Sequence, residues 1–315
     1  MKNILSVLTR IILTAVMLVF LFKWIKVEEI AEVLRAIRPG YLLISGFLFF
    51  LIYLLCLLRW YLLLKSIGIH PPPRKMFVSY CGGILFNLFL PSTVGGDVVR
   101  IMDLTNSIKR TKEIAASVFV DRLSGFSALA FTALLAIAFG HSYVDKGGIL
   151  IPVLILFAFL SFLIVILFTK NIFLKIISFI PAHPIRTKIE NLHKEIFYFR
   201  TKPKALLTAL LISFAVQVIN IAGSYYIFLA LGLKLNLIHL FIFVPLIGAV
   251  AMVPVSIGGL GVRDMGSVFF FAKIGIAKNV AVAFSLLNFF FISLAGVGCG
   301  LIYVLALYNR WLQRR

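Results

Sequence analysis

The chain has 315 residues, of which 62% are hydrophobic, and its mean hydropathy is +1.09. Soluble domains are about 45–50% apolar, so this composition excludes a soluble globular protein and indicates one integral membrane domain spanning 1–315. The formal net charge is +20. In membrane proteins such an excess collects in cytoplasmic loops that face anionic lipid headgroups. Because no RNA-binding motif surrounds the basic residues, we expect no nucleic-acid partner.

Six segments are long and apolar enough to span a bilayer, which requires about 20 residues. They are 4–22, 41–64, 114–140, 148–169, 205–231 and 279–308. Segment 4–22 lacks a following cleavage site of small residues, so we interpret it as a retained first span. Two shorter apolar runs, 76–90 and 237–253, are predicted to be re-entrant or broken helices. The predicted fold is therefore an all-α polytopic membrane protein with six spanning helices, or eight if the short runs also span.

The basic residues predict the orientation of these spans. Segment 170–204 carries eight Lys and Arg residues, which places it in the cytoplasm. With six spans, both termini are then cytoplasmic, and we expect a multi-pass protein of a prokaryotic cell (inner) membrane. In this arrangement loop 23–39 faces outward. It carries four basic residues, which disagrees with the rule that Lys and Arg collect on the cytoplasmic side. Within the cytoplasmic segment, apolar residues at helical spacing over 185–199 predict an amphipathic surface helix.

A short pattern occurs twice, 163 residues apart. Residues 91–100 read PSTVGGDVVR and residues 254–263 read PVSIGGLGVR, so both fit P-x3-G-G-x3-R. Hydrophobic segments interrupted by Gly and Pro at matching points of two halves indicate a transporter binding site. Each predicted half contains an odd number of spans, so the second half is inverted. We expect inverted halves at about 1–145 and 146–315, with the two motifs approaching each other near the midplane.

The first motif has the residue types of an anion site. Gly95 and Gly96 allow close backbone approach, Asp97 is placed to cap a helix beginning near Val98, and Arg100 can bind two phosphate oxygens. Alternatively, the glycines could serve only close helix packing. That interpretation does not explain the two matched arginines, so we favour the anion site. Asp121 and Arg122 lie inside span 114–140. A buried structural ion pair and direct contact with lipid are equally good interpretations of these two residues. The candidate lipid-binding residues are Ser92, Thr93, Gly95, Gly96, Asp97, Arg100, Asp121, Arg122, Ser256, Gly258, Gly259, Gly261, Arg263 and Asp264.

Other chemistry lacks sequence support. The three cysteines lie in apolar stretches, and their odd number implies no disulfide framework. The chain has no HExxH, no GxSxG, no Walker lysine loop and no Cys/His metal spacing. We therefore expect no enzyme, no cofactor and no metal site.

Three motifs resemble a known family. LPSTVGGDVVR at 90–100, FVDRLSG at 119–125 and PVSIGGLGVRDMG at 254–266 are similar to the flippase-like membrane region of lysylphosphatidylglycerol synthases. The resemblance extends to stand-alone proteins once grouped as an uncharacterised family. It implies movement of lipid between leaflets, with the motif residues at the polar centre. The synthases also carry a cytosolic aminoacyl-transferase domain without a counterpart here, so synthase activity is not implied. Asp264 departs from the family's usual glutamate but keeps the charge.

The leading hypothesis is a flippase-like transporter of a phosphate-bearing lipid, either a phospholipid or a polyprenyl-linked lipid. Its partners are then membrane lipids with anionic or phosphate-bearing headgroups. A second hypothesis is a lipid-binding scaffold for a membrane biosynthetic enzyme, which should co-purify with a stoichiometric protein. A third is a membrane-embedded transferase with Asp97 or Asp121 as base, which should turn over a headgroup in detergent.

Overall fold

The computed structural model describes residues 27–89, 93–140, 150–178, 184–251 and 259–312, and these residues form helices and short turns without a strand. The elements are α2 (Val27–Arg35), α3 (Pro39–Ser66), α4 (Pro73–Phe89), α5 (Thr93–Ile108), α6 (Thr111–Gly140), α7 (Leu150–Phe168), α8 (Lys170–Ile177), α9 (Pro184–Tyr198), the 3-10 turn η2 (Phe199–Thr201), α10 (Pro203–Ala230), α11 (Leu237–Ala251), α12 (Val262–Ala272) and α13 (Lys278–Leu312). Four helices begin with proline, whose missing N–H costs nothing in the first turn. The predicted span 4–22 lies outside the described residues.

Four helices, α3, α6, α10 and α13, are long and apolar enough to cross a membrane. They correspond to four of the predicted spans, and a helix satisfies its backbone hydrogen bonds internally, as hydrocarbon requires. The segment predicted to span at 148–169 forms α7, after which the chain bends by 95° into α8. If this bent pair counts as one span, the described residues contain five. The total of six remains a prediction.

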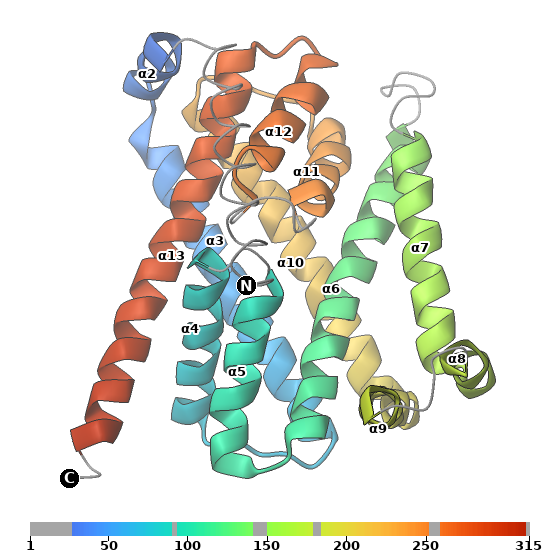
Figure 1. The fold of residues 1–315 in the computed structure, drawn as a ribbon. Helices are drawn as coiled ribbons and strands as arrows, with labels where there is room; N and C mark the ends of the chain where they lie inside the picture. The colour runs from blue at the N-terminus through green and yellow to red at the C-terminus, as the bar shows by residue number, and fades with distance from the viewer. Residues whose placement is uncertain (1–26, 90–92, 141–149, 179–183, 252–258, 313–315) are drawn as a thin grey trace, which may run out of the picture.

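The two short apolar runs each form the first arm of a helical hairpin. Helix α4 packs against α5, and α11 packs against α12. At about 1.5 Å per residue, α4 and α11 are roughly 23–26 Å long, shorter than the hydrocarbon layer of about 30 Å. Figure 1 shows that the α4–α5 hairpin rises from the end of the bundle where α8 and α9 lie. The α11–α12 hairpin descends from the opposite end, the end at which α2 also lies.

The long helices hold these hairpins in place. Helices α3 and α10 pack along each other, α13 packs on α4, and α6 packs on α11. The largest apolar cluster joins α3, α6 and α10–α13, and it includes Phe228, Phe243, Phe271 and Phe284. Their rings stack or meet edge to face at centroid distances of 4.6–5.7 Å. This aromatic contact fixes the second hairpin between its neighbours.

The predicted amphipathic helix is present as α9. It packs against the beginning of α6, where Ile196 and Phe199 are buried with Leu63 and Val120. His193 stacks on Phe173 of α8 at a centroid distance of 3.5 Å, and its Nε2 lies 3.0 Å from the carbonyl oxygen of Leu167. Helix α9 therefore closes one end of the bundle beneath α6 and α7 (Figure 1).

Close contact within the first hairpin depends on glycine. A Cβ atom added to Gly96 of α5 would lie 2.0 Å from the carbonyl oxygen of Gly83 and 2.4 Å from Oδ1 of Asn87, both in α4. The backbone N–H of Gly96 donates to that same Oδ1 at 3.1 Å. Gly96, predicted to admit a ligand, thus brings two helices together, as small residues do in membranes.

We expect Gly96→Ala to separate α4 from α5 and to destabilise the protein by about 1–3 kcal/mol, because the backbone of α4 cannot yield to the added methyl group. The matched control is Gly298→Ala in α13, where a Cβ atom meets nothing within 4 Å. Thermal unfolding in detergent compares the two variants. Equal melting temperatures for both would show that the hairpin is not closely packed at Gly96.

Candidate functional site

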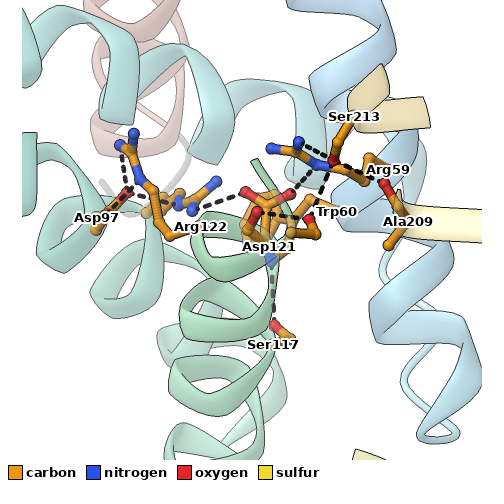
Figure 2. Close-up of polar contacts among 10 residues, drawn as sticks. Arg59, Trp60, Asp97, Ser117, Asp121, Arg122, Ala209 and Ser213 are labelled. Carbon is orange, nitrogen blue, oxygen red and sulfur yellow. Dashed lines mark hydrogen bonds and ion pairs between the residues drawn. The ribbon is translucent and has the colours of Figure 1, made fainter. Parts of the chain in front are cut away.

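Five charged side chains from three helices meet inside the bundle: Arg59 of α3, Asp97 and Arg100 of α5, and Asp121 and Arg122 of α6 (Figure 2). We call this group the arginine cluster. All except Arg122 are buried residues. Charged groups within a membrane are costly and mark structural pairs or transport pathways.

Asp121 is the centre of the arginine cluster. Its Oδ1 accepts a hydrogen bond from Nε of Arg59 at 2.7 Å, and its Oδ2 accepts one from Nη2 of Arg100 at 3.2 Å. The carboxylate thereby joins α3, α5 and α6. Nη1 of Arg59 also donates to the hydroxyl of Ser213 in α10 at 2.6 Å, which adds a fourth helix.

Asp97 forms the second pairing. Arg122 donates to both of its carboxylate oxygens, from Nε at 2.8 Å and from Nη2 at 2.9 Å. This two-point geometry is the one that makes arginine suited to carboxylates and phosphates. Nε of Arg100 lies 3.2 Å from Oδ1 of Asp97 as an ion pair, but it lacks the alignment of a hydrogen bond.

The five side chains of the arginine cluster carry one net positive charge, because three arginines face two aspartates. Trp60 covers part of this charge, since the guanidinium carbon of Arg100 lies 4.8 Å from the centre of its ring. Nε1 of Trp60 donates to Ser117 at 3.1 Å, which fixes the ring. Asp103, one turn further along α5, accepts from Ser79 of α4 at 2.5 Å. Arg122 keeps 31% of its side chain exposed, so it is the most accessible of the three guanidinium groups.

The structure corrects the role predicted for Asp97. Helix α5 begins at Thr93, so Asp97 lies within the helix and does not cap it near Val98. The reason is that Gly95 and Gly96 continue the helix against α4 rather than forming a loop. In the structure Arg122 pairs with Asp97, and Asp121 pairs with Arg100.

Sequence reasoning missed Arg59, Trp60 and Ser213. Arg59 lies seven residues before the end of α3, or about 10 Å along the axis, a depth from which a long side chain can extend toward the membrane surface. It is instead only 6% exposed and bound to Asp121. The available signal was the cost of an arginine that deep in an apolar run, which calls for a carboxylate partner.

The second motif forms a separate polar group at the beginning of α12. Nε of Arg263 donates to the hydroxyl of Ser285 in α13 at 3.1 Å, and that hydroxyl donates to Oδ1 of Asp264. Oδ2 of Asp264 accepts from the backbone N–H of Gly261 at 2.8 Å. Gly261 has φ of 79°, a conformation that glycine adopts without strain. Asp264, the third residue of α12, therefore accepts from the residue that precedes the helix, whereas Asp97 had been expected to precede its own helix.

Arg263 retains binding capacity. It is 6% exposed, and among the described residues its Nη2 has no hydrogen-bond partner. Its guanidinium carbon lies 5.1 Å from the ring centre of Phe289. Arg100 and Arg263 bind different partners, so their predicted convergence on one headgroup remains a prediction. Gly259 faces Ala251 of α11 rather than open space. Ser92, Ser256, Gly258 and the side chain of Thr93 lie outside the described part of the chain.

Comparison with known proteins identifies the relatives of this chain. Residues 7–306 match the family model described as the lysylphosphatidylglycerol synthase TM region. A UPF0104 membrane protein of Methanothermobacter thermautotrophicus is 27% identical over 300 residues, covering 85% of this chain and 87% of that protein. One from Pyrococcus horikoshii is 24% identical over 304 residues, covering 88% and 90%. One from Methanocaldococcus jannaschii is 21% identical over 300 residues, covering 88% of each.

We expect Asp121→Asn to destabilise the protein by about 3–5 kcal/mol, because it leaves Arg59 and Arg100 buried without a balancing charge. The control is Glu190→Gln, which breaks the part-exposed pair with Arg186 in α9 and should cost no more than about 1 kcal/mol. Thermal unfolding in detergent measures both. An Asp121→Asn protein as stable as Glu190→Gln would contradict a supporting role for this carboxylate.

Proposed function

The chain belongs to the family of the lysylphosphatidylglycerol synthase transmembrane region, and we propose that it moves a phosphate-bearing lipid between the leaflets of a membrane. The headgroup phosphate would occupy the arginine cluster while the chains stay in hydrocarbon. The relatives are membrane proteins of similar length, and the four long apolar helices make this chain a multi-pass membrane protein. The lipid would be a phospholipid or a polyprenyl-linked lipid.

The observation that carries this proposal is the net positive charge of the arginine cluster. Three arginines share two carboxylates, so the group is completed by one negative charge. A lipid phosphate supplies such a charge at the end of an apolar chain. Arg122 is partly exposed and already holds Asp97 through a two-point contact. A phosphate could take over that contact, because its oxygens have the same spacing for a guanidinium.

An inverted repeat would give the lipid a second site. Shifting residues 39–66 by the 163 residues between the two motifs gives 202–229, one residue from α10. The same shift moves α4 to 236–252, which overlaps α11 at 237–251. The same shift relates α6 to α13. The packing of α4 on α13 then corresponds to the packing of α11 on α6, and both contacts occur. Arg263 would then bind phosphate near the opposite leaflet, through its Nη2.

The inverted arrangement predicts that the loops before the two hairpins face opposite sides of the membrane. His70→Cys and Lys234→Cys, both at exposed positions, are introduced into a variant in which Cys56, Cys81 and Cys299 are replaced by alanine. Lys194→Cys in α9 marks the side expected to be cytoplasmic. An impermeant maleimide should label positions 70 and 194 from one side and position 234 from the other. Labelling of positions 70 and 234 from the same side would exclude the inverted repeat.

Lipid movement is tested in sealed proteoliposomes that contain fluorescent phosphatidylglycerol, with dithionite reporting the outer leaflet. We expect Arg122→Gln to slow movement about 10-fold or more, because a charge-assisted contact contributes about 1.5–3 kcal/mol. Arg122→Lys should recover part of the rate, since lysine keeps the charge and loses the two-point geometry. The control is Arg186→Gln, in the surface pair of α9.

The outcomes of this experiment separate the three hypotheses. Unchanged rates in Arg122→Gln, at equal folded fractions, would exclude the arginine cluster as the transport site. Absence of movement in the wild type, together with a stoichiometric co-purifying protein, would support the scaffold. Headgroup turnover in detergent would support the transferase.

A further inference from the structure

An apolar cavity of about 260 Å³ lies between α6, α7 and α10. Its walls are hydrophobic apart from two serines, and the lining residues are Ser127, Ala130, Phe131, Phe157, Leu160, Ser161, Ile164, Leu210 and Phe214. The Ser127 hydroxyl already donates to the carbonyl oxygen of Leu123 at 2.8 Å, so it adds little polarity. Phe131 and Phe214 meet edge to face with ring centroids 5.6 Å apart. Such a wall suits hydrocarbon and not water.

Asp121 of the arginine cluster lies on the face of α6 that continues into this cavity. Asp121, Ser124, Ser127 and Phe131 follow each other at intervals of three or four residues, the spacing of one helix face. The hydroxyl oxygen of Ser124 lies 3.2 Å from that of Ser213, which binds Arg59. Ser213 also directly precedes Phe214 of the cavity wall. Asp121 and Ser127 are separated by about 9 Å along the axis, a short step from charge to hydrocarbon.

The order of charged and apolar groups along α6 matches the orientation of a lipid in one leaflet. Helix α6 begins at the end of the bundle where α8 and α9 lie (Figure 1). Asp121 lies ten residues, or about 15 Å, from the first residue of α6. Residues 127–131 lie near the middle of this 30-residue helix. A lipid in the leaflet on the α9 side has its headgroup toward that end and its chains toward the middle.

We infer that this cavity holds one hydrocarbon chain of a lipid from the leaflet on the α9 side, while the phosphate of the same lipid contacts the arginine cluster. The inference rests on the proposed function and names where its substrate is held before it moves. Helix α7 forms the outer wall, since it packs along α6 at the margin of the bundle and stands apart from α10 in Figure 1. A chain could therefore reach the cavity sideways from the bilayer.

The experiment uses the full chain in nanodiscs and two photoactivatable probes. One is phosphatidylglycerol with a diazirine in the middle of one acyl chain, and the other is diacylglycerol with the same chain and no phosphate. Labelled peptides are mapped by mass spectrometry. We expect phosphatidylglycerol to label the cavity residues at least several-fold more than diacylglycerol does. Arg122→Gln should remove most of this preference.

A cavity-filling variant gives an independent measure. Ser161→Trp should reduce labelling several-fold by occupying the space. Its matched control, Phe162→Trp, changes the neighbouring side chain, which is 62% exposed, and should leave labelling unchanged. If Ser161→Trp fails to fold, the comparison of the two probes on the wild-type protein still tests whether labelling of the cavity depends on the phosphate.

Equal labelling by both probes, or a preference that persists in Arg122→Gln, would overturn the inference and assign the cavity to surrounding bilayer lipid. Lipid movement measured on the same preparations separates this failure from failure of the proposed function. If the protein moves lipid but the labelling ignores the phosphate, only the inference fails. If the labelling requires phosphate but no lipid moves, the proposed function fails and the binding site stands.

Discussion

The contact between Asp121 and two arginines determines how the first half of this protein is assembled. Arg59, Arg100 and Asp121 come from α3, α5 and α6, so one carboxylate positions a hairpin between two long helices. Attraction between apolar surfaces does little to bring helices together in hydrocarbon, where packing and polar contacts must do so. The hairpin therefore needs both its glycine contact with α4 and this charged contact with α6. Removal of either leaves groups that the membrane cannot solvate.

The sequence was sufficient for much of the architecture because hydrocarbon imposes strict rules on the backbone. Helices α3, α6, α10 and α13 occur where apolar length predicts them, and α9 follows its proline and its helical spacing. The repeated motif correctly marked two hairpins, since Gly and Pro interrupt apolar runs at both positions. The bend after α7 was not predicted, because a helix that ends at Phe168 and resumes at Lys170 leaves no strong signal in a basic segment.

The chemistry of the site was less predictable because it depends on which side chains meet in space. Sequence placed Asp97, Arg100, Asp121 and Arg122 in the polar centre, and they do form one cluster. It could not show that Arg59 completes this cluster, because that contact joins residues 62 positions apart. Asp97 was expected to cap the helix after the first motif but lies inside it, and the capping carboxylate that the structure shows is Asp264 in the first turn of α12. The two motifs look alike in sequence but have different polar partners, so equal spacing did not imply equal contacts.

The opposite direction of the two arms in each hairpin also determines the electric field at the centre of the bundle. Helix α4 brings its carboxyl end, with a partial negative charge, to the place where α5 brings its amino end, with a partial positive charge. Helices α11 and α12 do the same from the other side (Figure 1). Within each pair the backbone dipoles therefore largely cancel, and the arginine and aspartate side chains set the sign of the field. In this architecture the sign of the field can therefore change through replacement of a few side chains, without any change in the backbone.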